Sequence, residues 1–218
     1  MPSCAGCGID EQFDARRAEG DLRRFRRRGL DASTKQLLAA IAAVPGGAAT
    51  TLLDIGGGIG SIHHELLARG FAAAVHVDRS AAFIAVATRE AARRGHGGRV
   101  RFVQGDFRGL ASQLGPADVV TLDRVVCCDP DCVGLLKAAA SRVRNTLALT
   151  YPRDRWFVRA IVTLSNAWRW LRGSAFRVYV HPPALMAATL EREGLQRTFA
   201  GGTLVWRVEL FARALTTV

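Results

Sequence analysis

Residues 52–61 read LLDIGGGIGS and are the most informative part of the sequence about its fold. The first half of this stretch is a buried strand that ends at the acid Asp54 and Ile55, and a glycine-rich turn then leads into a helix at Ser61. Glycines let the backbone turn tightly and leave room for a ligand beside a helix N-terminus. The dinucleotide fingerprint would place a third glycine at position 61, and an acid before the first glycine suits a positively charged ligand better than a pyrophosphate. The stretch therefore predicts a ligand-binding loop; the alternative is that its glycines only turn the chain.

Similar apolar runs alternate with helical patterns between residues 50 and 150, which is typical of a parallel sheet covered on both faces. After residue 180, a helix is expected from Pro182-Pro183 to Glu193, followed by a hairpin that turns at Gly201-Gly202. We thus predict a Rossmann-like, doubly wound α/β sheet of seven strands, mostly parallel, with a C-terminal antiparallel hairpin. The expected strands are Thr51–Ile55, Ala74–Asp78, Val100–Gln104, Asp118–Asp123, Thr146–Tyr151, Gln196–Ala200 and Thr203–Arg213.

One domain is expected, because 218 residues are too few for two independent cores. We divide it into an N-terminal helical cap (1–45), a ligand-binding core (46–154), a helical insertion on the substrate side (155–183), and a helix and hairpin (184–218) that complete the sheet. Within the insertion, we expect an apolar stripe at helical spacing to pack in the core; the alternatives are a substrate wall and a basic helix at a membrane surface. The stripe consists of Phe157, Ala160, Ile161, Leu164, Ala167, Trp168 and Leu171.

The chain is strongly basic, since 28 arginines and 2 lysines against 19 acidic residues give a net charge of +11. Such a surface favours anionic partners: nucleic acid, molecules with phosphate or carboxylate groups, or a membrane face. No apolar run approaches the ~20 residues that cross a bilayer, and the N-terminus lacks the apolar core of an export signal. We therefore expect a cytoplasmic protein whose cysteines are reduced.

Acidic residues stand at the ends of three successive predicted strands: Asp54 at the first, Asp78 at the second and Asp106 at the third. The carboxyl ends of parallel strands border the ligand crevice of such a sheet. With the glycine loop, these acids make residues 45–213 resemble the class I S-adenosylmethionine-dependent methyltransferases. The resemblance implies that Asp54, Gly56, Gly58 and Gly60 hold the methionine part of the cofactor, that Asp78 holds the ribose, that Asp106 and Phe107 line the adenine pocket, and that Asp123 completes the cofactor site.

Two further motifs are similar to those of the magnesium-protoporphyrin O-methyltransferase group. They are Arg26-Arg27-Arg28-Gly29-Leu30-Asp31 leading into Thr34, and Leu122-Asp123 leading to Asp129-Pro130-Asp131. The group carries a histidine shortly after the Leu-Asp pair, where this chain has Cys127-Cys128.

Methyl transfer from a sulfonium is an in-line displacement, so the enzyme mainly positions a nucleophile in a dry site. A carboxylate or thiolate acceptor needs no base, whereas a hydroxyl or amine benefits from one. We assign Tyr151 and His181 to orienting or deprotonating the acceptor; the alternatives are a packed strand end and a neighbour of a helix cap. His63 and His64 are expected on a helix surface. The expected substrate-side residues are Phe13, Phe25, Arg26, Cys127, Cys128, Arg153 and Trp156.

The cysteines offer a second hypothesis, because Cys4 and Cys7 have zinc-like spacing and Cys127, Cys128 and Cys132 could supply further thiolates. We expect no metal, and we expect Cys127 and Cys128 to be small buried apolar residues.

The function expected is O-methylation of a small apolar or aromatic acceptor that bears acidic groups, with S-adenosylhomocysteine as the second product. The alternatives are an RNA methyltransferase and a non-catalytic protein that binds the cofactor or a metal. Nucleic acid is not the expected partner, because strand four lacks an Asn/Asp-Pro-Pro-Tyr signature and no Pro-Cys motif is present.

Overall fold

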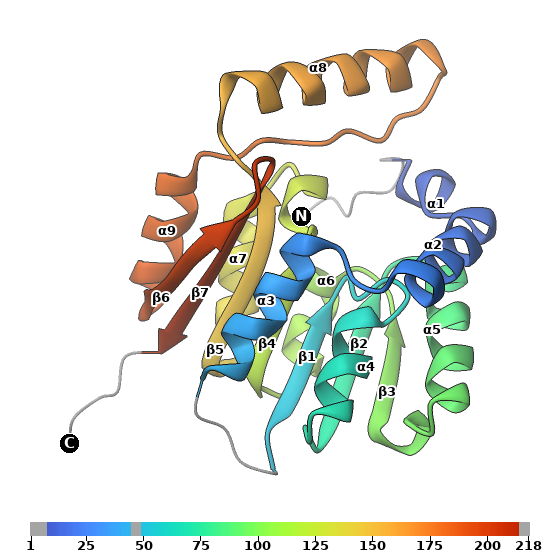
Figure 1. The fold of residues 1–218 in the computed structure, drawn as a ribbon. Helices are drawn as coiled ribbons and strands as arrows, with labels where there is room; N and C mark the ends of the chain where they lie inside the picture. Colours follow the sequence, from blue (N-terminus) through green and yellow to red (C-terminus); the bar gives the residue numbers. More distant parts are fainter. Residues whose placement is uncertain (1–7, 45–48, 214–218) are drawn as a thin grey trace.

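The computed structural model describes residues 8–44 and 49–213, and a seven-stranded sheet forms its centre (Figure 1). The strand order along the sheet is β3-β2-β1-β4-β5-β7-β6. The first five strands of the chain run parallel, and β7 pairs antiparallel with both β5 and β6. The strands are β1 (Thr51–Ile55), β2 (Ala73–Asp78), β3 (Val100–Gln104), β4 (Ala117–Asp123), β5 (Val143–Pro152), β6 (Leu195–Gly202) and β7 (Trp206–Arg213).

Helices cover both faces of the sheet, because successive side chains of a central strand point to opposite faces. Leu52 of β1 packs with α3 and α4, whereas Leu53 packs in the larger cluster formed with α7 and α9. The helices are α1 (Ile9–Gln12), α2 (Ala15–Arg28), α3 (Ala32–Ala42), α4 (Ser61–Ala68), α5 (Ala81–Arg93), α6 (Phe107–Leu110), α7 (Cys132–Ala140), α8 (Trp156–Leu171) and α9 (Pro183–Arg192), with short 3-10 turns at Gly97–Arg99, Ala111–Gln113 and Val126–Cys128.

The five parallel strands and the helix after Pro182 are confirmed within a few residues, but the position of the hairpin turn is corrected. Gly201 and Gly202 are the last residues of β6, and the chain turns over Thr203–Val205. The Thr203 N–H donates to the Trp206 carbonyl at 2.8 Å, which closes the turn. Gly202 has φ +127°, and a Cβ there would lie 2.1 Å from the Trp206 carbonyl oxygen. These glycines therefore allow a close approach of the strands rather than forming the turn itself.

The N-terminal helix α2 lies across the carboxyl end of the sheet, against α5. Asp14 caps it by accepting from the Arg17 N–H at 2.8 Å, and Gly29 ends it with φ +70°. Its apolar face buries Leu22 and Phe25 in a cluster with Phe83 and other residues of α5. Its arginines Arg23, Arg24, Arg26, Arg27 and Arg28 are exposed.

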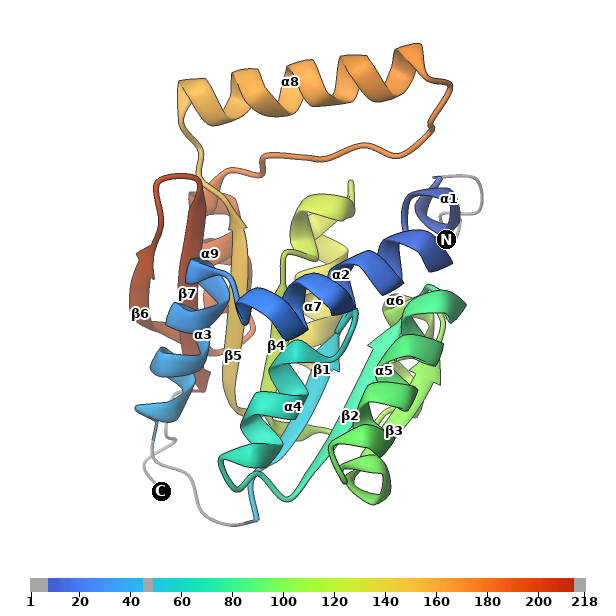
Figure 2. The same ribbon diagram turned by 45° about the vertical axis from the view of Figure 1, so that its right-hand side comes forward.

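Helix α8 departs most from the prediction. It lies beyond the carboxyl ends of the strands, apart from the sheet, and the segment 172–182 runs back beneath it (Figures 1 and 2). Only Val158 of this helix is buried, so the expectation that its apolar stripe packs in the core is wrong. Among the described residues, no helix has the length and apolar character needed to span a membrane.

Candidate functional site

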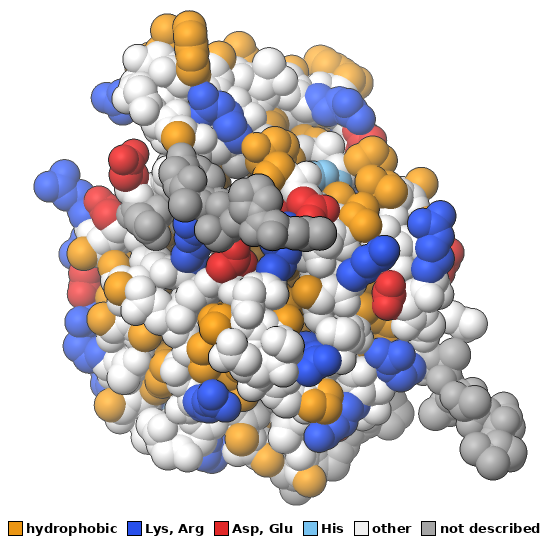
Figure 3. Space-filling view, turned by 180° about the vertical axis from the view of Figure 1, so that it is seen from behind, with side chains coloured by type: hydrophobic (Ala, Val, Ile, Leu, Met, Phe, Trp, Pro, Cys, Tyr) orange, Lys and Arg blue, Asp and Glu red, His pale blue; other side chains and the backbone are white. Residues whose placement is uncertain are grey.

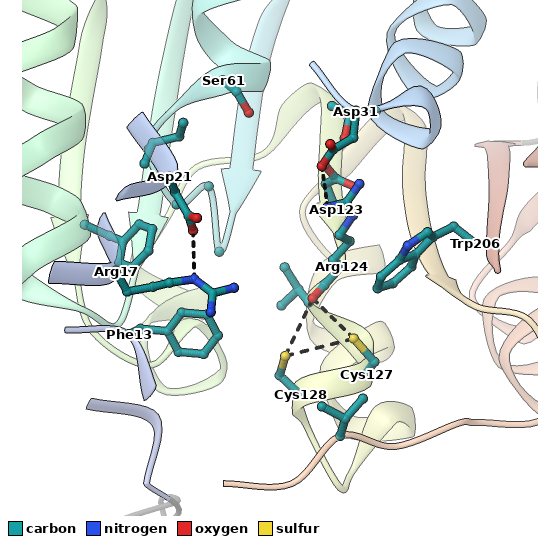
Figure 4. Close-up of a pocket in the computed structure, with 18 of the residues that line it drawn as sticks. Phe13, Arg17, Asp21, Asp31, Ser61, Asp123, Arg124, Cys127, Cys128 and Trp206 are labelled. Atoms are coloured by element: carbon teal, nitrogen blue, oxygen red, sulfur yellow. Dashed lines mark hydrogen bonds and ion pairs between the residues drawn. The ribbon is translucent and has the colours of Figure 1, made fainter. Parts of the chain in front are cut away.

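A cavity of about 590 Å³ opens at the carboxyl ends of β1, β2 and β4 (Figure 4). Its lower half is formed by the glycine loop and the strand ends, and its upper half by α2, α8 and the segment beneath α8. The lower half is rich in glycine and acids. The upper half is aromatic and basic, so the cavity offers two chemically distinct compartments.

The glycine loop presents its backbone to the cavity. Gly56 and Gly58 have φ of +60° and +56°, a region in which L side chains are strained. The Gly56 N–H donates to the Val77 carbonyl at 2.7 Å, which holds the loop against β2. A Cβ at Gly56 would come within 2.6 Å of Val125, whereas the space beside Gly58 is open as far as Phe83 at 3.7 Å. The loop therefore leaves a ledge against which a ligand can lie.

Asp78 forms one wall of this ledge. Its two carboxylate oxygens accept from the Ser80 N–H at 2.8 Å and from the Gly58 N–H at 2.9 Å, so the side chain is fixed in place. Burial raises the pKa of Asp78, and these backbone N–H groups act against that shift. Each carboxylate oxygen can accept a second hydrogen bond. Asp78 is thus placed to receive hydroxyl groups of a ligand.

Asp54 lies beneath the loop in a buried polar cluster. It accepts from the Thr121 hydroxyl at 2.7 Å, and its other oxygen lies 3.3 Å from Nδ1 of His63. Nδ1 of His76 is 3.1 Å from that of His63. Burial lowers the pKa of His63 and of His76 to about 3, so both are neutral near pH 7, and burial raises the pKa of Asp54.

The same three side chains are the one group in the described ranges whose His, Cys, Asp or Glu ligand atoms converge as a metal site would require. These atoms already contact one another, and a Cβ on Gly57 would lie 2.5 Å from Nδ1 of His76. We therefore assign the cluster to supporting the loop. The expectation that His63 and His64 lie on a helix surface is wrong, since both are fully buried.

The two motifs quoted for the closer resemblance meet at the next strand end. Asp123 accepts from the hydroxyls of Thr34, at 2.8 Å, and of Thr150. Arg124 follows with φ +62°, pairs with Asp31 at 2.8 Å and lies over the Trp206 ring at 4.8 Å. Burial raises the pKa of Asp123. This junction joins β4 to the start of α3 and of β7 at the edge of the cavity.

Cys127 and Cys128, two of the residues expected on the substrate side, line the cavity. Their sulfurs are 4.0 Å apart, and each lies within hydrogen-bond distance of the Arg124 carbonyl oxygen (Figure 4). The hydrogen bond from Cys127 lowers the pKa of Cys128, and the nearby charge of Arg169 adds to this effect. Cys132 is buried in the main core and lies apart from the cavity lining, and Cys4 and Cys7 fall outside the described residues.

Aromatic rings form the upper compartment. Phe13 and Phe25 line it as predicted, and Phe13 packs edge-on against Phe176 at 5.5 Å. Phe176 in turn carries the Arg169 guanidinium 5.6 Å above its ring. Sequence reasoning missed Phe176 and Arg169; the available signal was that Arg169 lies off the apolar stripe of its helix.

Neither residue assigned to acceptor chemistry lines the cavity. Tyr151 is buried, and its hydroxyl donates to Glu209 at 2.5 Å; burial and this neighbour raise its pKa. Nε2 of His181 lies 2.9 Å from the Asp129 carbonyl oxygen, and its ring stacks on Tyr179. The structure therefore does not bring either side chain into the cavity: Tyr151 contacts Glu209, and His181 contacts the loop at Asp129.

Three predicted substrate-side residues also lie elsewhere. Arg26 binds Glu90 of α5, Arg153 donates to backbone carbonyls of the β6–β7 turn, and Trp156 is 82% exposed on α8. None of these three side chains lines the cavity, because the helix or strand end that carries each one directs it elsewhere. The basic residues that line the cavity are Arg17, Arg24, Arg79, Arg124 and Arg169.

The remaining cofactor assignments are placed as follows. Gly60 begins α4 with φ +83° beneath the loop, where a Cβ would collide with His63, and it does not line the cavity. Phe107 is buried in the main core, which corrects its assignment to an adenine pocket. Asp106 caps α6 and borders a smaller adjoining hollow that shares Phe13 and Arg79 with the main cavity.

Residues 52–146 match a protein-family model described as a methyltransferase domain. The fold is similar to that of magnesium protoporphyrin IX methyltransferase from Synechocystis PCC 6803 with bound S-adenosylhomocysteine, with TM-score 0.71 and 17% identity over 94% of this chain and 98% of that one. It is also similar to an O-methyltransferase family protein from Burkholderia thailandensis, with TM-score 0.69 and 19% identity over 93% and 61%. A putative methyltransferase from Haloferax volcanii, in complex with the Trm112 activator, matches with TM-score 0.68 and 15% identity over 94% and 96%.

None of the curated protein sequences compared with this chain matches it. At identities below 20%, the structural matches establish the fold, and the family model adds the domain type. Residues 52–146 are therefore a methyltransferase domain, and the described chain has the class I fold of S-adenosylmethionine-dependent methyltransferases.

Proposed function

We propose that the protein methylates a carboxylate oxygen of a small apolar or aromatic acceptor. The observation that carries this proposal is the composition of the cavity. Its glycine-rich, acidic compartment adjoins an aromatic one with arginines, and its described lining contains no histidine, lysine or tyrosine.

In this proposal, the ledge holds the cofactor, which supplies an electrophilic methyl group on a sulfonium. The loop from Gly56 to Gly58 and the carboxylate of Asp54 beneath it hold the cationic methionine end, and Asp78 accepts from the ribose hydroxyls. Asp106, in the adjoining hollow, accepts from the adenine amino group. The fixed geometry of Asp78 and the open space beside Gly58 support this assignment.

The upper compartment holds the acceptor. The rings of Phe13, Phe176 and Trp206 provide an apolar surface that excludes water from the reacting atoms. Arg17 and Arg24 are paired with Asp21, and Arg124 is paired with Asp31. Arg169 differs from these three, because within the described ranges its side chain meets no carboxylate and donates only to the Ser165 hydroxyl. It is therefore the cation that we assign to an acidic group of the acceptor.

The lining also bears on the accepting atom. A carboxylate attacks the methyl carbon through an oxygen that is already deprotonated, so no proton has to be removed. A hydroxyl or amine acceptor benefits from a base, and the two candidate bases of the sequence, Tyr151 and His181, do not reach the cavity. A methyl ester is thus the product that best fits this lining.

The test is methyl transfer from radiolabelled cofactor to matched pairs of aromatic compounds, one carrying a carboxylate and the other a carboxamide at the same position. Magnesium protoporphyrin IX, named for one structural neighbour, belongs in the panel. We expect base-labile methyl esters from the carboxylates and no product from the carboxamides. Base-stable products, equal transfer to both members of each pair, or transfer to RNA alone would overturn the proposal.

A further inference from the structure

Helix α8 turns its apolar side to the solvent. Leu164, Leu171 and Trp168 lie on one stripe of the helix and are 71%, 70% and 59% exposed. Single exposed apolar residues are common on proteins, but a contiguous stripe along a whole helix marks an interaction surface. In Figure 3, hydrophobic and basic side chains occur together along the upper edge of the molecule, where Figure 1 places α8.

The opposite side of α8 is polar and is fixed to the segment beneath it. The Asn166 side chain donates to the Val178 carbonyl at 2.8 Å and accepts from the Val178 N–H at 3.0 Å. Arg169 donates to Ser165 and lies over Phe176 on this same side. These contacts set the rotation of the helix, so the outward direction of the stripe follows from specific hydrogen bonds.

Charge around the stripe is mainly positive. Residues 155–190 contain no aspartate or glutamate, and their exposed arginines are Arg155, Arg159 and Arg172; the acid just before them, Asp154, pairs with Arg159. Arg172 lies over the Trp168 ring at 5.1 Å, so a cation stands directly beside the indole of the stripe. Arginine beside tryptophan along an apolar face is the composition of helices that lie in the interface of a bilayer.

We propose that α8 binds flat on an anionic lipid bilayer, with its apolar stripe among the acyl chains and its exposed arginines at the lipid phosphates. An anionic membrane satisfies both the stripe and the arginines. A second copy of the chain would cover the stripe but would oppose arginine with arginine. Because Val158, Ile161, Val162 and Arg169 of α8 line the cavity, this binding brings the cavity mouth to the membrane surface.

The full chain is tested with vesicles of phosphatidylcholine alone or mixed with phosphatidylglycerol, by co-sedimentation and by tryptophan emission. Three of the four tryptophans lie on α8, so the emission reports mainly on this helix. We expect binding and a blue shift with the anionic vesicles, weakening as salt rises, and little binding to phosphatidylcholine. The measurement needs neither cofactor nor acceptor, so it is independent of the proposed function.

The double variant Leu164→Ser, Leu171→Ser should bind the anionic vesicles at least ~10-fold more weakly, because two apolar side chains no longer enter the bilayer. Neither residue lines the cavity. Leu185→Ser, at an exposed position of α9, is the matched control and should bind like the wild type. Equal binding by the double variant and the control, with circular dichroism showing both folded, would overturn the proposal. So would absence of vesicle binding by the wild type, or a dimer in sedimentation velocity that the double variant abolishes.

Discussion

Glu90 of α5 offers the sharpest test of how the upper compartment is held on the sheet. Its side chain is fully buried, and its two oxygens accept N–H groups from Arg26, Arg93 and Arg94 at 2.5–3.1 Å. Hydrogen bonds from Arg93, with the other two arginines, hold the pKa of Glu90 well below its usual range. Arg26 belongs to α2, so this carboxylate joins the cavity wall to the core helix α5.

The change Glu90→Gln removes the charge and keeps the size of the side chain. Removing one partner of a buried ion pair costs about 3–5 kcal/mol. The arginines here are 23–52% exposed and can turn toward water, so we reduce the expected loss to about 2 kcal/mol. For a chain of this length, that corresponds to a fall in Tm of roughly 4–8 °C. Arg26→Gln leaves Glu90 with two arginines and should lower the Tm by no more than about 3 °C.

Thermal unfolding followed by circular dichroism measures both variants, and limited trypsin digestion reports on α2, whose arginines become cleavable when the helix detaches. We expect faster cleavage within α2 in Glu90→Gln than in the wild type. A Tm within 1 °C of the wild type for Glu90→Gln, or equal effects of the two variants, would refute this account of the cluster.

Three further predictions follow from the site. Tyr151→Phe should lower the free energy of unfolding by about 1–3 kcal/mol, because one oxygen of the buried Glu209 loses its donor while the other keeps Arg197 and Arg207, and kcat should stay unchanged; a large fall in kcat would support a catalytic role for Tyr151. Arg169→Gln should raise KM for a carboxylated acceptor about 10-fold or more. Arg172→Gln, at the C-cap of α8 and outside the cavity lining, should leave KM unchanged, and equal KM values for the two variants would contradict the assignment of Arg169 to the acceptor site. Burial lowers the pKa of His76 from 6.5 to about 3, so below pH 6.5 the unfolded state binds more protons than the folded state, and stability decreases as the pH is lowered. Denaturant titration should show that this residue contributes a loss of about 1 kcal/mol between pH 6.5 and 5.5, and this loss should be absent in His76→Gln.

The sheet could be predicted from the sequence because its strands carry their own signal. Leu52 and Leu53 face opposite helical layers, and a strand apolar on both faces belongs in the middle of a parallel sheet. The positions of the strand-end acids could also be predicted, since parallel strands place Asp78 and Asp123 along the same edge of the sheet. The two motifs quoted from the sequence lie side by side in the structure, since Thr34 of one donates a hydrogen bond to Asp123 of the other.

The roles of single side chains at the site could not be read in the same way. Tyr151 stands at a strand end, but the pleat turns it toward Glu209 rather than toward the cavity. For α8, the helical spacing of the apolar stripe predicts two unlike faces but not which face meets the protein. Tertiary hydrogen bonds decide that, and those of Asn166 turn the apolar face outward. Arg26 shows the same limit, because its partner Glu90 lies 64 residues away in the chain.

The proposed function depends on cofactor binding by Asp78 and the glycine loop. Calorimetric titration with S-adenosylhomocysteine tests this binding, using the wild type, Asp78→Asn and, as a matched control, Asp131→Asn, an exposed helix cap that does not line the cavity. We expect wild-type binding in the micromolar range, a loss of at least ~10-fold in Asp78→Asn since hydrogen bonds to a charged group are replaced by weaker ones, and no change in Asp131→Asn. Absence of binding by the wild type, or equal affinity in folded Asp78→Asn, would contradict it.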